Sequence, residues 1–330
     1  MNLKHELRYI REIKDRDRKR PLITEDNISY RNWWKVEKEK NWFTTFIENN
    51  INGSSEKIRF YSVFGPRKAL NECFDGKKVF YSGENLERVS RYRNLKTDEV
   101  AYRVWMKRYR EYGDYALSEM NLSLGFAEKK DANYIRFPLW ITFLFSPDST
   151  YEEIKDRINC INNRQVSTNR EGTALIASHD QFGSREYIYN DLKDVVDIQC
   201  AGKWNHNTDL LKDKYGDSKK DYLFHKKFNI CPENVDASGY VTEKLFDAFA
   251  AGTIPIYQGD GNNPEPKVIN RNAVIFWNFE SGNNEENIKL ISKLDSDDDL
   301  YREFMMQPVF KEGAAEVVWS YFERLKNGLM

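Results

Sequence analysis

The sequence predicts an α/β protein of two domains, each with a parallel sheet that carries helices on both faces. Segments rich in β-branched and aromatic residues alternate with helix-like segments in both halves of the chain. A length of 330 residues suffices for two domains, and 40% hydrophobic residues provide a core for each. A polar stretch without clear periodicity, residues 161–172, is the predicted linker. Two such domains side by side would leave a cleft between them.

The first half opens with a charged segment. Residues 4–20 carry eight basic and four acidic side chains, which predicts a solvated helix or tail, with weak contact to a membrane surface or partner as the alternative. Residue types and periodicity then predict the following elements. Strands are expected at residues 27–34, 58–63 and 77–82, short apolar pieces at 122–126 and 134–137, and helices at 35–50, 98–112 and 151–160.

The second half alternates regularly. Helix 242–251 is the best defined, because Thr242 is a suitable N-cap, Gly252 stands where a C-terminal glycine belongs, and Leu245, Phe246 and Phe249 form a buried stripe. The other elements follow from the same patterns. Strands are expected at 173–178, 195–200, 227–231, 253–257 and 273–277, and helices at 184–192, 285–294, 297–305 and 313–326.

Composition excludes several classes of function. The 51 basic and 52 acidic residues nearly cancel, so no nucleic-acid partner is expected. No apolar run approaches the ~18–20 residues of a membrane span, and the amino terminus lacks the apolar centre of a signal peptide. We therefore expect a cytoplasmic protein, with peripheral contact to an inner membrane as an open alternative. Four scattered cysteines and four isolated histidines complete no metal pattern.

The most informative segment is residues 227–259, KFNICPENVDASGYVTEKLFDAFAAGTIPIYQG. It predicts a strand, a polar loop, a helix and a second strand, which places the loop at the carboxyl edge of a parallel sheet, where such folds bind ligands. The helix start offers unpaired N–H groups and a positive dipole end that suit a phosphate. The segment resembles the donor-binding motif of the α-1,3/4-fucosyltransferases, glycosyltransferase family 10, and is similar to that of bacterial members.

The resemblance implies a fold and a set of donor contacts. The implied fold is GT-B, two Rossmann-like domains with parallel sheets facing a cleft, in which the last helix often crosses back to the first domain. Glu243 would hold the ribose hydroxyls of GDP-fucose and Lys244 would neutralise the diphosphate. Asn234 and Tyr240 would also touch the donor.

A second carboxyl-edge loop follows strand 173–178. Arg185 is expected one residue into the next helix, where its guanidinium can fork onto phosphate oxygens, and the family places an arginine here to hold the diphosphate. Ser178 is a weaker candidate in the same loop. Lys203, after the next strand, could add positive charge.

Three residues of the first half are candidates on the acceptor side. Glu84 follows strand 77–82 and Gly83; alone it would be read as a solvated turn residue, but its Gly-Glu-Asn context resembles the position of the general base in bacterial family members. Trp33 and Trp34 end the first strand and are assigned either to core packing or to stacking on an acceptor sugar.

The resemblance to this family implies an inverting α-1,3-fucosyltransferase. It would move L-fucose from GDP-β-L-fucose to the 3-OH of a GlcNAc or Glc unit in a lactosamine- or lactose-type glycan, with GDP-fucose as co-substrate and no metal or other cofactor required. Another GT-B transferase with a different nucleotide sugar, or a non-catalytic nucleotide-sugar-binding protein, remains the alternative. The predicted divisions are a charged segment 1–22, an acceptor-side domain 23–162, a GDP-fucose-binding domain 163–312 and a helix 313–330 that packs back on the first domain.

Overall fold

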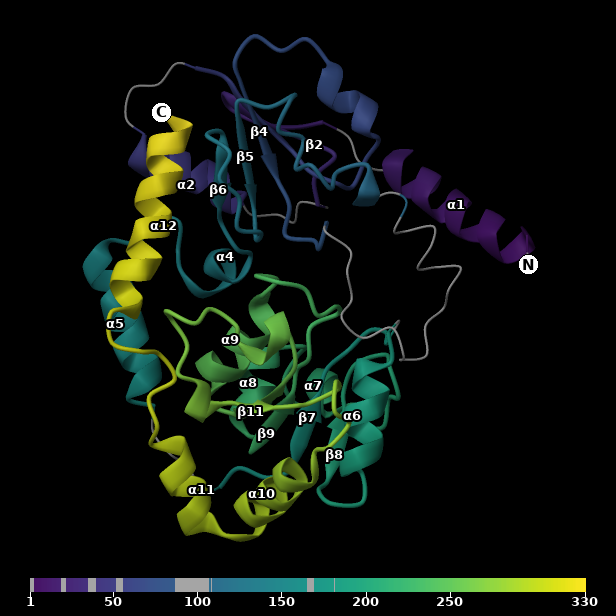
Figure 1. Cartoon of the computed structure of the whole chain (residues 1–330), viewed down its shortest axis with the longest axis vertical. Helices are drawn as coiled ribbons and strands as arrows, with labels where there is room; N and C mark the ends of the chain where they lie inside the picture. Colours follow the sequence, from purple (N-terminus) through teal and green to yellow (C-terminus); the bar gives the residue numbers. More distant parts are fainter. Residues whose placement is uncertain are drawn as a thin grey trace. The chain divides into compact units, whose positions relative to one another are not determined.

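The computed structural model describes residues 3–18, 22–34, 40–51, 56–86, 107, 109–164, 169–180 and 182–330. Contacts divide the chain into two compact units. Of the described residues, the first unit contains 3–86, 107–150 and Val318–Met330, and the second contains Tyr151–Val317. The α/β class with two parallel sheets, predicted from the sequence, is confirmed (Figure 1).

The first unit is built on a six-stranded sheet. Its strands lie in chain order and run parallel from β2 to β6, with β1 antiparallel at the edge. The strands are β1 (Ile23–Glu25), β2 (Ile28–Arg31), β3 (Ile58–Tyr61), β4 (Lys77–Tyr81), β5 (Leu122–Gly125) and β6 (Tyr134–Arg136).

The start of this sheet differs from the prediction. The expected strand 27–34 ends at Arg31, and a short strand before it pairs back on it, so the sheet is not parallel throughout. Asp26 adopts a φ of 53°, which a short polar side chain tolerates in the tight turn between β1 and β2. Trp33 and Trp34 therefore lie beyond the strand that was expected to orient them.

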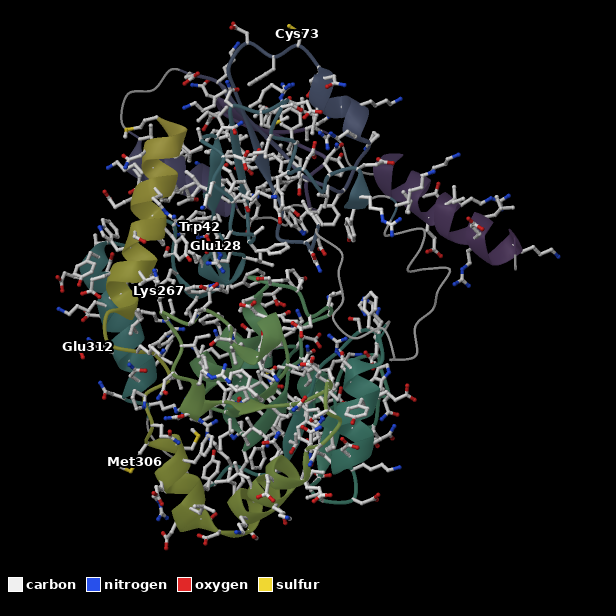
Figure 2. All side chains as sticks on the ribbon, in the orientation of Figure 1. Trp42, Cys73, Glu128, Lys267, Met306 and Glu312 are labelled. Carbon is white, nitrogen blue, oxygen red and sulfur yellow. The ribbon has the colours of Figure 1, made fainter. Side chains whose placement is uncertain are left out.

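Helices and short 3₁₀ turns connect the strands of the first unit. Helix α2 (Trp42–Asn50) starts later than expected because the Asn41 side chain caps it by accepting from Phe43 N; residues 35–39 are outside the described part. The predicted helix 98–112 also falls mostly outside it. The other elements are α1 (Leu3–Arg18), η1 (Arg67–Asn71) and α4 (Trp140–Leu144). The free thiol of Cys73 projects from the loop after η1 (Figure 2).

Helix α12 (Ala314–Leu329) joins the first unit through its later part. The Tyr321 hydroxyl accepts a hydrogen bond from the Arg136 guanidinium at the end of β6. Gly328 packs so closely that a Cβ there would lie 2.6 Å from Ile135 Cδ1. The helix therefore runs beside β6 as one layer of this unit (Figure 1).

The second unit has a five-stranded, fully parallel sheet in the order β11–β10–β9–β7–β8. Its strands are β7 (Thr173–Leu175), β8 (Ile198–Cys200), β9 (Phe228–Ile230), β10 (Ile254–Tyr257) and β11 (Ile275–Phe276). From β7 the chain moves outward to β8, whereas from β9 it moves the other way to β10. The order therefore reverses between β7 and β9, and ligands bind at such a switch point in open α/β sheets.

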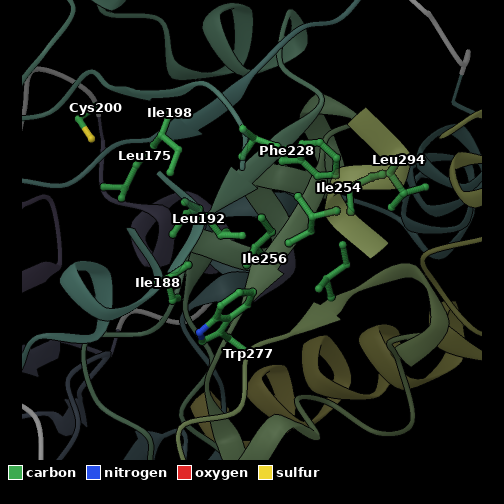
Figure 3. Close-up of a cluster of buried hydrophobic side chains, with 14 of the residues drawn as sticks. Leu175, Ile188, Leu192, Ile198, Cys200, Phe228, Ile254, Ile256, Trp277 and Leu294 are labelled. Carbon is green, nitrogen blue, oxygen red and sulfur yellow. The ribbon is translucent and has the colours of Figure 1, made fainter. Parts of the chain in front are cut away.

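Helices cover both faces of this second sheet. One core contains Leu175, Ile188, Leu192, Ile256 and Trp277 and extends to the later helices (Figure 3). A smaller core on the other face gathers around Ala174, with side chains of α7, α8 and α9. The helices of the first face are α6 (Ser184–Leu192), α10 (Glu285–Ser296) and α11 (Asp298–Met305); those of the second are α7 (Leu210–Asp213), α8 (Lys219–Phe224) and α9 (Glu243–Ala251).

Helix α5 (Tyr151–Asn162) belongs to the second unit by its contacts, whereas the sequence placed it at the end of the first domain. Asn162 explains the difference. Its side-chain oxygen accepts from Phe310 N at 2.8 Å, and its amide donates to Phe310 O at 3.1 Å. These bonds connect the end of α5 to the segment between α11 and α12.

Candidate functional site

A cavity of about 240 Å³ lies at the switch point of the second sheet. The loops after β7 and β9 form two of its walls, and the end of β9, the start of α6, α8 and α9 contribute the rest. Three cationic and two anionic side chains face it. The residues that line it are Ile176, Ala177, Ser178, His179, Arg185, Lys219, Leu223, Asn229, Ile230, Cys231, Pro232, Asn234, Glu243, Lys244 and Asp247.

A fully buried carboxylate, Glu233, organises the cavity wall. It accepts hydrogen bonds from Thr242 N at 2.7 Å, from Thr242 Oγ1 at 2.7 Å and from the Tyr257 hydroxyl at 3.3 Å. The Lys244 ammonium lies 3.0 Å from Oε2 of Glu233, the oxygen that also accepts from Thr242 Oγ1. Thr242 stands at the N-cap as predicted, but its side chain makes no cap bond; Glu233 caps the helix from the preceding loop instead.

Lys244 is held in the first turn of α9. Its Nζ donates to Thr242 Oγ1 at 2.8 Å as well as to Glu233, and Glu243 Oε1 lies 3.7 Å away. Burial lowers the pKa of this ammonium, but attraction to Glu233 and Glu243 outweighs burial, so the pKa is raised above its usual value. Lys244 is therefore a fixed positive charge at a helix N-terminus.

Arg185 reaches the same cavity from the start of α6. Its Nη2 donates to Asn234 Oδ1 at 2.8 Å and its Nη1 donates to the His179 carbonyl at 3.1 Å, with Asp180 Oδ1 3.6 Å away. Burial lowers the pKa of the guanidinium and Asp180 opposes the change, but arginine stays charged at neutral pH. The structure thus joins three predicted residues, Arg185, Asn234 and Lys244, around one cavity.

Two acidic side chains of α9 also line the cavity. Glu243, which was predicted, and Asp247, which was not, are one helical turn apart and so share a face. Burial raises the pKa of the Asp247 carboxyl to about 6; Glu243 adds to the rise, while Lys219 and Lys244 oppose it. In the described part of the chain, Asp247 has no hydrogen-bond or ion-pair partner.

The remaining predicted donor residues lie differently. Ser178 lines the cavity with an exposed side chain. Tyr240 is 4% exposed, lies in the loop before α9 and is not among the residues that line the cavity. Lys203 is exposed after β8 and is not among the residues that line the cavity.

The acceptor-side candidates belong to the first unit. Glu84 lies in the loop directly after β4, partly exposed, with its backbone N–H donating to Ser82 Oγ at 3.1 Å. Trp33 is only 4% exposed and packs among Tyr30, Phe43 and Phe60, which favours the packing interpretation for this residue. Trp34 keeps partial exposure and contacts Phe64 and Tyr81.

Two acidic residues of the site were not predicted from the sequence. Glu233 stood in the predicted loop without a role, although its place in the Glu-Asn pair of the motif was a usable signal. Asp247 was visible as an acidic residue four positions after Glu243 on a helix whose other face is apolar.

Two models of known protein families match this chain, one in its first part and one in its second. A family model described as the N-terminal domain of the α-(1,3)-fucosyltransferase FucT matches residues 28–143, and one described as the C-terminal part of glycosyltransferase family 10 (fucosyltransferase) matches residues 166–307. The chain belongs to glycosyltransferase family 10. The second of these matches contains every residue that lines the cavity.

Individual relatives of this family 10 chain are distant. The α-(1,3)-fucosyltransferase FucT of Helicobacter pylori is 25% identical over 295 residues, which is 77% of this chain and 55% of that protein. The GDP-fucose protein O-fucosyltransferase 3 of Xenopus tropicalis is 29% identical over 132 residues, 38% of this chain and 28% of that protein. The matched region thus spans about half the length of the first relative and less than a third of the second.

Solved structures agree on the fold. A crystal structure of an α1,3-fucosyltransferase aligns with a TM-score of 0.54 at 20% identity and covers 91% of this chain and 89% of that one. A second, described as α1,3-fucosyltransferase with GDP, aligns with a TM-score of 0.53 at 19% identity over the same shares.

Two features are absent from the part of the chain that the structure describes. None of the helices in this part is both long enough and apolar enough to cross a bilayer. Nor do three or more of the described His, Cys, Asp and Glu side chains gather where they could hold a metal ion.

Proposed function

We propose that this family 10 chain transfers L-fucose from GDP-β-L-fucose to a sugar hydroxyl, with inversion to an α linkage. The observation that carries the proposal is the switch-point cavity in which Arg185 and Lys244 are both held beside the N-terminus of α9. Two fixed cations and free helix N–H groups match a diphosphate. The matches to fucosyltransferase family models make GDP-fucose the leading donor.

On the donor side, each residue has a distinct task. Arg185 and Lys244 neutralise the charge that grows on the diphosphate as the fucosyl bond breaks, which favours the transition state over the bound substrate. Glu243 accepts hydrogen bonds from the ribose hydroxyls, while Asn234, Tyr240 and Ser178 shape the donor site. Lys203 adds positive charge from outside the cavity lining. Because side chains meet the diphosphate charge, no bound metal or further cofactor is required.

On the acceptor side, Glu84 acts as general base. Its carboxylate takes the proton of the acceptor hydroxyl, the oxygen forms a bond to C1 of fucose, and the electrons of the breaking C1–O bond leave with GDP. We assign the acceptor as the 3-OH of a GlcNAc or Glc unit in a lactosamine- or lactose-type glycan, with Trp34 as the better placed of the two tryptophans to touch it.

The proposed setting is the cytoplasm, with peripheral contact to the inner membrane through the charged helix α1. Three of its side chains, Lys4, Arg8 and Arg11, are exposed. Basic side chains on one helix are attracted to an anionic lipid surface, and that attraction weakens as salt is added.

The donor is tested by thermal unfolding of the full chain with added nucleotides. GDP should raise the melting temperature, whereas UDP, CMP and ADP should not, since ligand that binds only the native state stabilises it by mass action. Stabilisation by another nucleotide instead would favour a GT-B transferase with a different donor.

The reaction is tested by incubating GDP-fucose with lactose, lactosamine and type-1 chains and reading the product linkage by NMR. Glu84→Gln should lower turnover by about 10²–10⁴-fold while GDP affinity stays near that of the wild type. Unchanged turnover in this variant would remove Glu84 from the mechanism. Wild-type chain that binds GDP-fucose without turnover on any acceptor would instead be a binding protein.

A further inference from the structure

We propose that Asp247 selects the base of the bound nucleotide, by accepting hydrogen bonds from the N1–H and the exocyclic N2–H of guanine. The inference rests on the proposed function, because GDP is the nucleotide of the proposed donor. It adds to the charged contacts a residue that tells guanine from other bases.

The first observation is that Asp247 is the one cavity carboxylate left without a partner in the described part of the chain. Glu243 lies 3.7 Å from Lys244, and the buried Glu233 beside the cavity accepts hydrogen bonds from four donor groups. Asp247 faces the same space, partly buried, and burial raises the pKa of its carboxyl. A partly desolvated charge without hydrogen bonds is costly, and a ligand that donates two of them would offset the cost.

The second observation is the position of Asp247 along α9. If the diphosphate binds at the start of α9 and the ribose binds at Glu243, the base extends along the helix. Asp247 is the next residue on that face of the helix. Leu223 and Ile230 offer apolar contact for a flat ring from α8 and the end of β9. Lys219, on α8, places an ammonium in the lining that can donate to guanine O6.

The hydrogen-bond donors of guanine match the acceptors of an ionised carboxylate. An ionised carboxylate only accepts hydrogen bonds, through two oxygens. Guanine presents two adjacent donors, N1–H and N2–H, whereas adenine presents one donor beside an acceptor and hypoxanthine lacks the exocyclic amine. A site built to bind a donor pair rejects an analogue that lacks one of them, since a buried oxygen is then left unpaired.

The test measures dissociation constants of the full chain by calorimetry at pH 7.5 for GDP, IDP, XDP, ADP and UDP. Wild type should bind GDP at least about tenfold more tightly than IDP, because IDP lacks the N2 amine. Asp247→Asn should lose that preference and bind XDP more tightly than GDP, since the new amide N–H can donate to the C2 carbonyl of xanthine. The matched control is Asp213→Asn, at an exposed aspartate outside the cavity lining, which should behave as wild type.

The possible results separate this inference from the function it rests on. Equal affinity of the wild type for GDP and IDP, or unchanged GDP preference in Asp247→Asn, overturns the role of Asp247 while leaving GDP as the nucleotide. Wild type that prefers ADP or UDP overturns both. A reversal of preference toward XDP in the variant alone supports both.

Discussion

Glu233→Gln removes the charge that ties the loop after β9 to α9, with little change in side-chain volume. A glutamine carbonyl in the place of Oε1 can still accept from Thr242 N, but the amide nitrogen in the place of Oε2 would face the Lys244 ammonium, donor against donor. Losing one partner of a buried ion pair costs about 3–5 kcal/mol. Because the Lys244 side chain is 20% exposed, water can partly solvate it, and we expect the lower end, about 3 kcal/mol.

The free energy of unfolding of Glu233→Gln is measured by urea denaturation followed by circular dichroism at pH 7. The pKa of Lys244 is raised above 10.5, so the ion pair contributes fully at pH 7 and is lost only as pH rises through that raised pKa. Glu312→Gln is the control, because Glu312 is exposed before α12 (Figure 2). A loss within about 1 kcal/mol of the control would refute the argument that Glu233 and Lys244 form a buried, mutually dependent pair.

Three further predictions test other parts of the chain. Asp247→Asn should raise the free energy of unfolding by about 2–3 kcal/mol at pH 8, since the wild-type pKa lies near 6 rather than 3.8. Stability from this carboxyl is greatest below pH 3.8 and is lost as pH rises through about 6, so urea titrations at pH 4 should show most of the difference gone. Arg185→Lys should weaken GDP binding about tenfold in calorimetry while Glu186→Gln does not, because an ammonium cannot bond Asn234 and a phosphate with fixed fork geometry. Gly328→Val should destabilise the first unit by about 1–3 kcal/mol in thermal unfolding, since its Cβ would lie 2.6 Å from Ile135 Cδ1; a neutral effect would mean that α12 is not packed there.

The sequence predicted the regular parts of the fold because local patterns determine them. Helix α9 is the clearest case: its apolar stripe and Gly252, which adopts a φ of 71° at the C-cap, can both be read from the sequence. Strand β1 could not be predicted in the same way, since three residues are too few to show an alternation, and its pairing depends on the turn at Asp26. The place of α5 likewise depends on a distant partner, Phe310.

The candidate site was predictable where residues follow strands and unpredictable where tertiary contacts decide their role. Arg185, Asn234 and Lys244 could be placed together because loops after neighbouring parallel strands share one edge of the sheet. The Glu-Asn pair marked Glu233, but its burial and its role could not be predicted, because they depend on tertiary contacts such as the one with Tyr257 of β10. Trp33 was ambiguous for the same reason, until Phe43 and Phe60 were seen to enclose it.

Glu233 and Asp247 show how differently one cavity wall treats two carboxylates. Glu233 is matched by donors from Thr242, Lys244 and Tyr257 and contributes to stability. Asp247 lowers stability at neutral pH and also weakens the positive field that would attract a diphosphate. Neither effect favours the protein without a nucleotide. A favourable contribution of Asp247 would therefore arise when a nucleotide is bound and supplies hydrogen-bond donors to its carboxylate. Selection of the base best explains a carboxylate that weakens both the fold and the attraction for phosphate. Specificity is the difference between the affinities for two nucleotides, so it can increase even when both affinities are lowered.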